Sequence, residues 1–294
     1  MMQNAHPSSH QRVLPTWMSM LYLPAHTAHA NAFPLGCRPD AVVLDLEDFV
    51  PSAEKTYARS RLAELAQGFA AQGIDVLVRI NRPLDEAVAD LQQAVRAEVR
   101  GLLVTKAASA QHLLLLDEFV SLLERRAGLP EGQICFIPLV ETAAALTQMD
   151  DIAAATSRNV AIALGGEDLA REARMRAGRD TLAYGKARLV SAAAAAGILP
   201  CGYLGSVLDF QGADDFRDLI DASRDFGFRL TTCMRPEQVE IVNIGYAPRA
   251  NELAWAQAVP ADAGIQDRAE AGWVMARARR CCARPKTLID GEAA

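Results

Sequence analysis

The chain has 294 residues, of which 51% are hydrophobic and 22% charged, and its formal net charge is −6 at pH 7. This composition excludes a largely disordered chain, allows one α/β barrel or about two smaller domains, and argues against nucleic-acid binding. No stretch approaches the roughly 20 apolar residues of a membrane span. The polar start MMQNAHPSSHQR has no apolar signal core, so we expect no membrane association and a cytoplasmic location.

Eight short apolar runs recur along the chain, with helical patterns between them. We predict strands at residues 18–23, 41–46, 75–80, 101–105, 134–140, 160–164, 201–207 and 228–233. Each is a continuous apolar run, as in a parallel strand covered on both faces. Strands that alternate with helices in this number predict a (β/α)8 TIM barrel of the α/β class, with an open doubly wound sheet as the structural alternative.

Apolar residues spaced three or four apart predict the helices. One such stripe runs from Ala58 to Phe69, after the second strand, and another runs from Val88 to Val99, after the third. A later Ala-rich helix is expected to end at Gly197, because glycine suits the residue that follows a helix.

No linker divides the chain, so we predict one barrel domain over residues 17–260. Residues 1–16 are expected to form a flexible N-terminal arm. Residues 261–294 are expected to form a short C-terminal helical extension, with its helix over 265–283. The basic end of that helix indicates a solvated helix terminus that complements the helix dipole; it comprises Arg277, Arg279, Arg280, Arg284 and Lys286.

Histidine and cysteine are scarce where common catalytic motifs would need them. Four of the five His lie in the first 29 residues, which leaves His112 for the rest of the chain. The six Cys form no CxxC pair, so reduced and mostly buried thiols are expected. The HExxH, GxSxG, Walker and GxGxxG motifs are absent from the sequence. An enzyme built on this chain must therefore use carboxylates together with Arg or Lys.

Charged side chains follow the carboxyl ends of the predicted strands, which share one face of a barrel. The charged residues are Asp45, Glu47 and Asp48 after the second strand, Arg79 on the third, Lys106 after the fourth, Glu141 after the fifth, and Glu167 and Asp168 after the sixth. Gly165 and Gly166 directly precede this last pair. Charge beside a buried apolar run is costly unless it is paired or used. The sequence therefore predicts one polar site at this face.

Two of these carboxylates predict a magnesium site. Glu141 and Asp168 end neighbouring strands and could share Mg²⁺, which takes one or two carboxylates and keeps waters for a substrate. Gly165 and Gly166 would let an ion or ligand approach the backbone closely. Capping of the following helix is the alternative role for either carboxylate.

Arg79 and Lys106 at this face could each have either of two roles. Arg79 can grip a substrate carboxylate through two hydrogen bonds, and it can also pair with the acidic residues one strand away. Lys106 is equally suited to an ion pair with a carboxylate and to substrate contact. No feature marks it as a Schiff-base lysine.

These segments resemble the citrate lyase beta-subunit-like group of the aldolase/citrate lyase family. The resemblance runs from about residue 18 to 259 in family order. It is carried by LYLPA (21–25), DAVVLDLEDFVPSAEKTYAR (40–59), VLVRIN (76–81), IPLVETAAAL (137–146), IALGGEDLA (162–170) and RPEQVEIVN (235–243). The LDLED…K…AR string with a later ET and GxEDL is specific in combination.

The resemblance implies a barrel that forms homotrimers or homohexamers, with Mg²⁺ held by Glu141 and Asp168. It implies that Arg79 binds the carboxylate of a 2-oxo acid, and that Glu47 and Asp48 serve the water shell of the metal. The implied reaction cleaves a 3-hydroxy-3-carboxyacyl-CoA into acetyl-CoA and a 2-oxo acid. Citramalyl-CoA and malyl-CoA are the leading substrates, and a citryl thioester is a further candidate. Gly165, Gly166, Glu167 and Lys106 are the remaining candidates for substrate contact.

The chain departs from the family pattern at four places. The loop after the first strand has few basic residues, Arg235 replaces a His, Cys201 stands where Asp is common, and only three residues follow Gly291, so a final Asp is not present. From this ending we expect simple cleavage rather than thioester hydrolysis. Two alternatives stay open. One is a free-acid aldolase that releases pyruvate or oxaloacetate, although the scarcity of His argues against it. The other is a non-catalytic paralogue that binds a 2-oxo acid and Mg²⁺.

Overall fold

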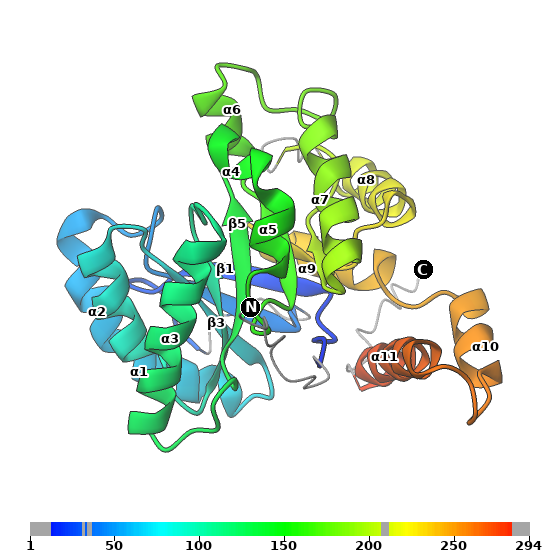
Figure 1. Ribbon diagram of the computed structural model, residues 1–294, viewed down its shortest axis with the longest axis horizontal. Coiled ribbons are helices and arrows are strands. Elements are labelled where there is room, and N and C mark those ends of the chain that lie inside the picture. The colour runs from blue at the N-terminus through cyan, green and yellow to red at the C-terminus, as the bar shows by residue number, and fades with distance from the viewer. Residues whose placement is uncertain (1–12, 31–32, 34–36, 207–211, 284–294) are drawn as a thin grey trace, which may run out of the picture.

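The computed structural model describes residues 13–30, 33, 37–206 and 212–283 (Figure 1). Within this part, eight parallel strands form one sheet in the order β7-β6-β5-β4-β3-β2-β1-β8. They are β1 (Ser19–Pro24), β2 (Ala41–Asp45), β3 (Asp75–Ile80), β4 (Val99–Val104), β5 (Cys135–Val140), β6 (Ala161–Leu164), β7 (Leu199–Cys201) and β8 (Thr231–Cys233). A bridge between Cys201 and Leu230 brings the two edges together, so the sheet is a nearly closed barrel. The predicted TIM barrel is confirmed.

Helices cover the outside of the barrel (Figure 1). They are α1 (Lys55–Ala70), α2 (Leu84–Ala94), α3 (Ala110–Arg126), α4 (Ala143–Thr147), α5 (Met149–Ala154), α6 (Gly166–Glu172), α7 (Ala183–Ala196), α8 (Ala213–Phe226), α9 (Pro236–Gly245), α10 (Ala250–Ala258) and α11 (Ile265–Cys282). The predicted stripe from Ala58 to Phe69 is buried along α1. Gly197 follows α7 in the left-handed conformation, with φ 65°, as expected for a glycine that ends a helix.

Two predicted boundaries are wrong. The seventh strand ends at Cys201 rather than starting there, because Gly202 (φ 144°) and Gly205 (φ 99°) turn the chain out of the sheet. The predicted stripe that reaches Val99 spans two elements. Helix α2 ends at Ala94, the next residue has an extended backbone, and Val99 begins β4.

The alternation of side chains along the strands divides the core in two. One set faces the helices and forms the larger cluster. The other set faces the barrel axis and includes Met20, Val43, Leu77, Leu103, Ile137, Leu139, Ala163 and Cys201. The same period of two places four residues at or just after the strand ends on the axis side of the barrel: Asp45, Arg79, Glu141 and Gly165. The pleat of the sheet thus positions the polar site above an apolar barrel interior.

Helix α11 lies against the barrel, and arginine residues fasten it there. Arg277 is 1% exposed and donates hydrogen bonds to two backbone carbonyls, at 2.6 and 3.0 Å. Arg280 pairs with Asp75, at the start of β3, at 2.8 Å. The prediction of a solvated basic helix end is therefore wrong for these two residues. Arg284 and Lys286 lie outside the described residues.

The two chain ends are only partly described. Residues 1–12 of the predicted arm and the segment around Gly291 lie outside the described residues. The last residues of the arm contact α11: the Pro15 carbonyl accepts a hydrogen bond from Trp273 at 2.8 Å, and the Thr16 hydroxyl accepts one from Arg280 at 2.9 Å. Among the described helices, none has the length and apolar character that crossing a bilayer requires.

Candidate active site

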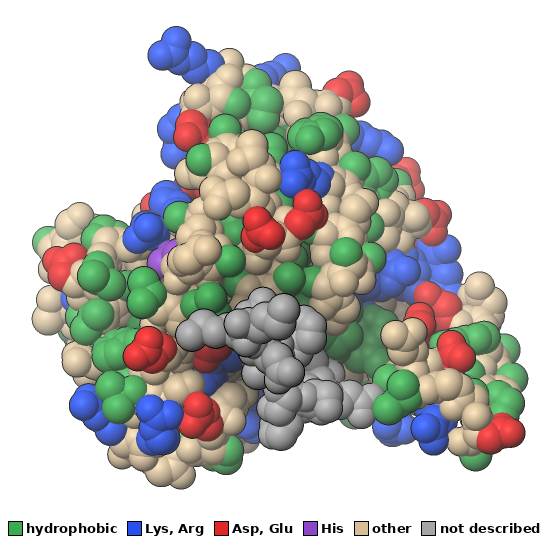
Figure 2. Space-filling model, viewed as in Figure 1, with side chains coloured by type: hydrophobic (Ala, Val, Ile, Leu, Met, Phe, Trp, Pro, Cys, Tyr) green, Lys and Arg blue, Asp and Glu red, His purple; other side chains and the backbone are tan. Residues whose placement is uncertain are grey.

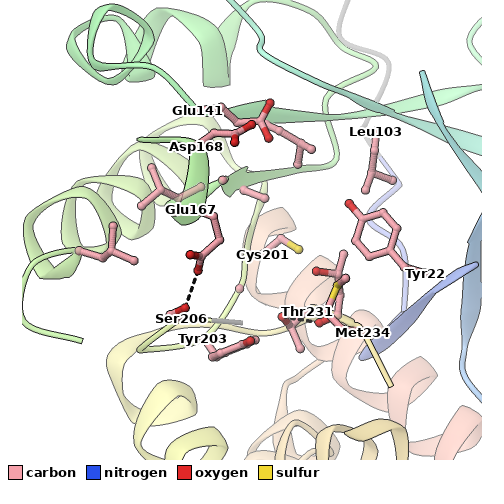
Figure 3. Close-up of a pocket in the computed structure, with 18 of the residues that line it drawn as sticks. Tyr22, Leu103, Glu141, Glu167, Asp168, Cys201, Tyr203, Ser206, Thr231 and Met234 are labelled. Atoms are coloured by element: carbon pink, nitrogen blue, oxygen red, sulfur yellow. Dashed lines mark hydrogen bonds between the residues drawn. The ribbon is translucent and has the colours of Figure 1, made fainter. Parts of the chain in front are cut away.

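A cavity of about 470 Å³ lies at the carboxyl end of the barrel strands (Figure 3). Most of the predicted site residues line it, namely Asp48, Arg79, Glu141, Gly165, Gly166, Glu167 and Asp168. Two others, Glu47 and Lys106, lie beside it and contact residues that line it. The structure therefore brings all the predicted site residues together. Below them the wall is apolar and consists of the barrel-interior residues Leu103, Ile137, Leu139, Ala163 and Cys201.

Arg79 is held by its predicted acidic partners. It is the register partner of Asp45 on β2, to which it donates through Nε and through Nη2, the latter at 2.9 Å. Its Nη1 atom lies 3.0 Å from Oε2 of Glu47. The rings of Tyr22 and Phe49 lie 5.1 and 4.8 Å from the guanidinium carbon. Burial opposes the charge, but the hydrogen bonds to Asp45 and the nearby acids outweigh it and raise the pKa of Arg79 above its ordinary value.

Lys106 joins the acidic residues of three strands. Its Nζ hydrogen-bonds to Glu47 and lies 3.6 Å from Oδ2 of Asp168, and its backbone N–H donates to Oε2 of Glu141 at 2.6 Å. Its φ of 47° is uncommon for a residue other than glycine. Burial opposes its charge, but the bond to Glu47 and the surrounding carboxylates raise the pKa of Lys106. The ion-pair role predicted for Lys106 is confirmed.

Glu141 and Asp168 form an acidic pair at one end of the cavity, where Figure 3 shows their carboxylates side by side. Glu141 is 5% exposed, and burial raises the pKa of its carboxyl group to about 7. The hydrogen bond from Lys106 opposes this rise, whereas the charges of Glu47 and Asp168 add to it. Burial also raises the pKa of Glu47. The site thus carries more negative charge than its own cations neutralise.

The helix-cap alternative does not account for the acidic pair. Thr142 caps α4, since its hydroxyl accepts a hydrogen bond from the backbone N–H of Ala145 at 3.1 Å, so Glu141 does not fill that role. Asp168 lies in the first turn of α6, which has no side-chain cap. Its Oδ1 pairs with Arg171 one turn later. Neither carboxylate therefore serves as a helix cap, and both line the cavity.

The residues present fit Mg²⁺. Carboxylate oxygens are its preferred protein ligands, and it is commonly held by one or two of them together with waters and substrate. Among the described residues there is no group of three His, Cys, Asp or Glu that could hold a metal ion, so a metal here would depend on two protein carboxylates. The raised pKa of Glu141, to which burial and the charges of Glu47 and Asp168 contribute, marks a position that favours a cation.

Gly165 and Gly166 are required by the close packing around the acidic pair. A Cβ atom on Gly165 would lie 2.4 Å from Cγ of Glu141, and one on Gly166 would lie 2.7 Å from Cδ1 of Leu182. The close approach predicted for these glycines is therefore made by protein side chains. Glu167, the next residue, accepts a hydrogen bond from Ser206 at 2.5 Å across the cavity wall (Figure 3).

Sequence reasoning missed two residues of this region. Tyr22 lines the cavity, and the only signal for it is the strand alternation that places it on the same face as Met20. Lys55 donates to the carbonyls of Leu46 and Glu47 at 3.0 and 3.2 Å and so holds the chain that carries the Glu47 carboxylate. Lys55 is the lysine of the LDLED…K…AR string that carries the resemblance, but the string gives no sign of this contact.

The comparisons with known proteins agree with the geometry. Residues 18–236 match the HpcH/HpaI aldolase/citrate lyase family. The chain belongs to this family. Citrate lyase subunit beta of Haemophilus influenzae is 29% identical over 260 residues, covering 87% of this chain and 88% of that protein. L-malyl-CoA/beta-methylmalyl-CoA lyase of Cereibacter sphaeroides is 26% identical over 271 residues, covering 80% and 84%.

Solved structures give the same assignment. The citrate lyase beta subunit of Mycobacterium tuberculosis, solved with oxaloacetate and magnesium, matches with a TM-score of 0.62 at 25% identity and covers 79% of this chain and 97% of its own. The resemblance seen in the motifs is thereby confirmed. The two relatives named above are called a lyase subunit and a lyase, and the M. tuberculosis citrate lyase beta subunit has a fold similar to that of this chain.

Proposed function

We propose that this protein is a magnesium-dependent carbon–carbon lyase that cleaves a 3-hydroxy-3-carboxyacyl-CoA into acetyl-CoA and a 2-oxo acid. Citramalyl-CoA and malyl-CoA are the proposed substrates, with a citryl thioester as a further candidate. The observation that carries the proposal is the acidic pair of buried Glu141 and half-buried Asp168, in a cavity that Arg79 also lines. Relatives named as a citrate lyase subunit and as a malyl-CoA lyase support the reaction class.

Glu141 and Asp168 would hold the metal ion, and Glu47 and Asp48 would accept hydrogen bonds from its waters. When bound, Mg²⁺ would supply a Lewis acid that lowers the pKa of the substrate hydroxyl and neutralises developing charge. The Glu141 carboxylate is fixed by the backbone N–H of Lys106 and by the tight contact with Gly165, and Asp168 is held by ion pairs with Lys106 and Arg171. This support keeps the acidic pair in one arrangement.

Arg79 would bind the carboxylate of the 2-oxo acid half. The Nε and Nη2 donors, which form one edge of its guanidinium, are committed to Asp45, so the group cannot rotate, and Nη1 is directed toward Glu47 and Asp48. A fixed guanidinium orients a carboxylate without further ordering cost. The backbone N–H groups of Gly166 and Glu167, in the first turn of α6, have no partner within the helix, and we propose that they donate to the same carboxylate.

Cleavage converts the substrate hydroxyl to a carbonyl and leaves the acetyl-CoA half as an enolate; the proton that the hydroxyl loses is balanced by the proton that the enolate carbon takes up, so the reaction has no net gain or loss of protons. The apolar lower wall of the cavity excludes water from the breaking bond and strengthens every polar contact above it. The histidine-based aldolase alternative lacks support, because His112 does not line the cavity and burial lowers its pKa to about 4. Among the residues described, no histidine lines the cavity.

The deciding experiment measures turnover of citramalyl-CoA and malyl-CoA with Mg²⁺ and with a chelator, following acetyl-CoA, pyruvate and glyoxylate. Glu141→Gln and Asp168→Asn should lower kcat by about 10²-fold or more while the far-UV spectrum and Tm stay near wild type. The same chemical change at exposed Glu270 on α11 is the control and should leave turnover unchanged. Release of products in the presence of chelator, or unfolding of both conservative variants, would contradict the proposal.

A further inference from the structure

Tyr22 enters the cavity from the barrel interior. Met20 belongs to the cluster around the barrel axis and Leu21 to the cluster under the helices, so the strand alternation turns Tyr22 toward the axis. Its side chain lines the cavity. Figure 3 shows it across the cavity from Glu167 and Ser206, with the phenolic hydroxyl at the end of the ring that points into the cavity.

The hydroxyl of Tyr22 hydrogen-bonds to no described residue. Most buried tyrosine hydroxyls have a protein partner, as Tyr246 does here, donating to the Gly202 carbonyl at 2.7 Å. The Tyr22 ring itself is firmly placed, because it lies 5.1 Å from the Arg79 guanidinium carbon and meets the Phe49 ring edge-on at 5.8 Å. A fixed ring therefore presents an unused donor to whatever occupies the cavity.

The surroundings of this hydroxyl select an oxygen as its partner. Burial raises the pKa of Tyr22 well above its ordinary value, and the charges of Asp45 and Glu141 add to the rise although Arg79 opposes it. The phenol therefore remains protonated and can donate. A substrate oxygen that carries negative charge between Arg79 and the acidic pair is the acceptor that this donor would meet.

We propose that Tyr22 is a further catalytic residue, whose hydroxyl donates a hydrogen bond to an oxygen of the 2-oxo acid half of the substrate beside Arg79. The proposal rests on the function proposed above. The hydrogen bond moves no proton. It stabilises the oxygen as the substrate hydroxyl loses its proton and the carbon–carbon bond breaks, so it matters more in the transition state than in the ground state. Loss of a donor of this kind costs about 10²-fold in kcat, and somewhat less where the charge is shared.

The test compares Tyr22→Phe with Tyr246→Phe, since each variant removes one hydroxyl from a tyrosine ring that is otherwise kept. Tyr22→Phe should keep the wild-type Tm, because no described group loses a partner, whereas Tyr246→Phe should lower Tm by leaving the Gly202 carbonyl without its donor. With Mg²⁺ present, Tyr22→Phe should bind pyruvate about tenfold more weakly. It should also cleave citramalyl-CoA with a kcat lowered about 10- to 100-fold.

The outcomes separate this proposal from the function on which it rests. Wild-type turnover and pyruvate affinity in Tyr22→Phe would overturn the role of Tyr22 and leave the lyase intact. A fall in Tm for Tyr22→Phe comparable to that of Tyr246→Phe would also overturn it, since the hydroxyl would then be a structural donor. If the wild-type protein neither binds pyruvate, glyoxylate or oxaloacetate with Mg²⁺ nor cleaves a thioester, the proposed function fails and the role of Tyr22 fails with it.

Discussion

At the scale of single residues, the site is governed by an excess of negative charge in a buried place. Arg79 is already committed to Asp45, and Lys106 to Glu47, so no cation in the described part of the chain is dedicated to Glu141. Its carboxyl group is buried beside other acids, and its pKa rises to about 7 for that reason. A divalent ion that binds at Glu141 must therefore compete with a proton near neutral pH.

This competition predicts a pH-dependent affinity for Mg²⁺. Below pH 7 the Glu141 carboxyl group is protonated in the metal-free protein, and binding of the ion releases that proton. The Kd for Mg²⁺ should rise about tenfold for each unit that the pH falls below 7, and should level off above it. Calorimetry from pH 5.5 to 8.5, in buffers with different ionisation enthalpies, measures both the affinity and the proton release.

The same shift fixes the sign of the effect on stability. The pKa of Glu141 lies above its unfolded value, so between about pH 4.5 and 7 the folded metal-free protein holds a proton that the unfolded chain has lost. Its contribution to stability therefore falls as pH rises through this window, and added Mg²⁺ should restore more of the Tm at pH 8 than at pH 6. Glu270→Gln should keep both profiles. A Kd for Mg²⁺ that is flat across the range would contradict the assignment of Glu141 as a ligand.

The sequence predicted the charged residues of the site better than their connections. Glu141 and Asp168 stand out because each follows an apolar strand directly, where an unpaired charge is costly. Tyr22 does not stand out, because an aromatic residue within a strand is ordinary and only closure of the barrel turns it toward the same cavity. The contact of Lys55 with the Leu46 carbonyl joins a helix to a strand end, and such a contact depends on tertiary packing.

At the scale of elements, the carboxyl ends of β5 and β6 come so close that only glycine fits between them. A Cβ on Gly165 would lie 2.4 Å from Cγ and 2.6 Å from Oε1 of Glu141. The Gly165 N–H also donates to the Val140 carbonyl at 2.9 Å, which ties the two strand ends together. The turn after β6 therefore sets the position of a side chain on the neighbouring strand.

Gly165→Ala should consequently displace the Glu141 carboxylate. We expect the affinity for Mg²⁺ to fall about tenfold or more, and the free energy of unfolding to fall by about 1–3 kcal/mol through overpacking. Calorimetry and denaturant unfolding measure the two effects. Gly272→Ala is the matched control, because a Cβ there meets open space within α11. It should leave metal binding unchanged and stabilise the helix by up to about 1 kcal/mol. Equal Mg²⁺ affinity in wild type and Gly165→Ala would contradict this account.

The elements differ in how well sequence patterns foretell them. Strand β3 and helix α1 have long apolar patterns bounded by polar residues, and both lie where the sequence predicts them. Strand β7 has only three residues, and the apolar run that follows it belongs to a turn that Gly202 makes possible. An apolar run shows that a segment is buried but not that it is extended, and a buried turn in the cavity wall satisfies the same pattern.

At the scale of the whole molecule, the C-terminal extension contacts the barrel through α11 and exposes large apolar side chains to solvent. Arg277 on α11 binds backbone carbonyls of the barrel, while α10 packs on α11 and lies farther from the barrel (Figure 1). Figure 2 shows hydrophobic side chains on the exposed surface of these two helices. Trp255 and Ile265 are 40% and 64% exposed there. Large exposed apolar side chains on the two outermost helices are suited to contact with a partner.

We therefore expect this surface to join copies of the chain into a homotrimer or homohexamer. Light scattering coupled to size exclusion should give three or six times the 31.7 kDa of one chain. Trp255→Glu combined with Ile265→Glu should lower that mass, because each places a charge in an apolar contact. Leu115→Glu, at a residue that is 68% exposed on α3, is the matched control and should not change the mass. A wild-type mass of one chain would contradict the predicted assembly. Loss of assembly in Leu115→Glu but not in the double variant would place the interface on α3 instead of the extension, because an added charge disrupts assembly only where copies of the chain are in contact.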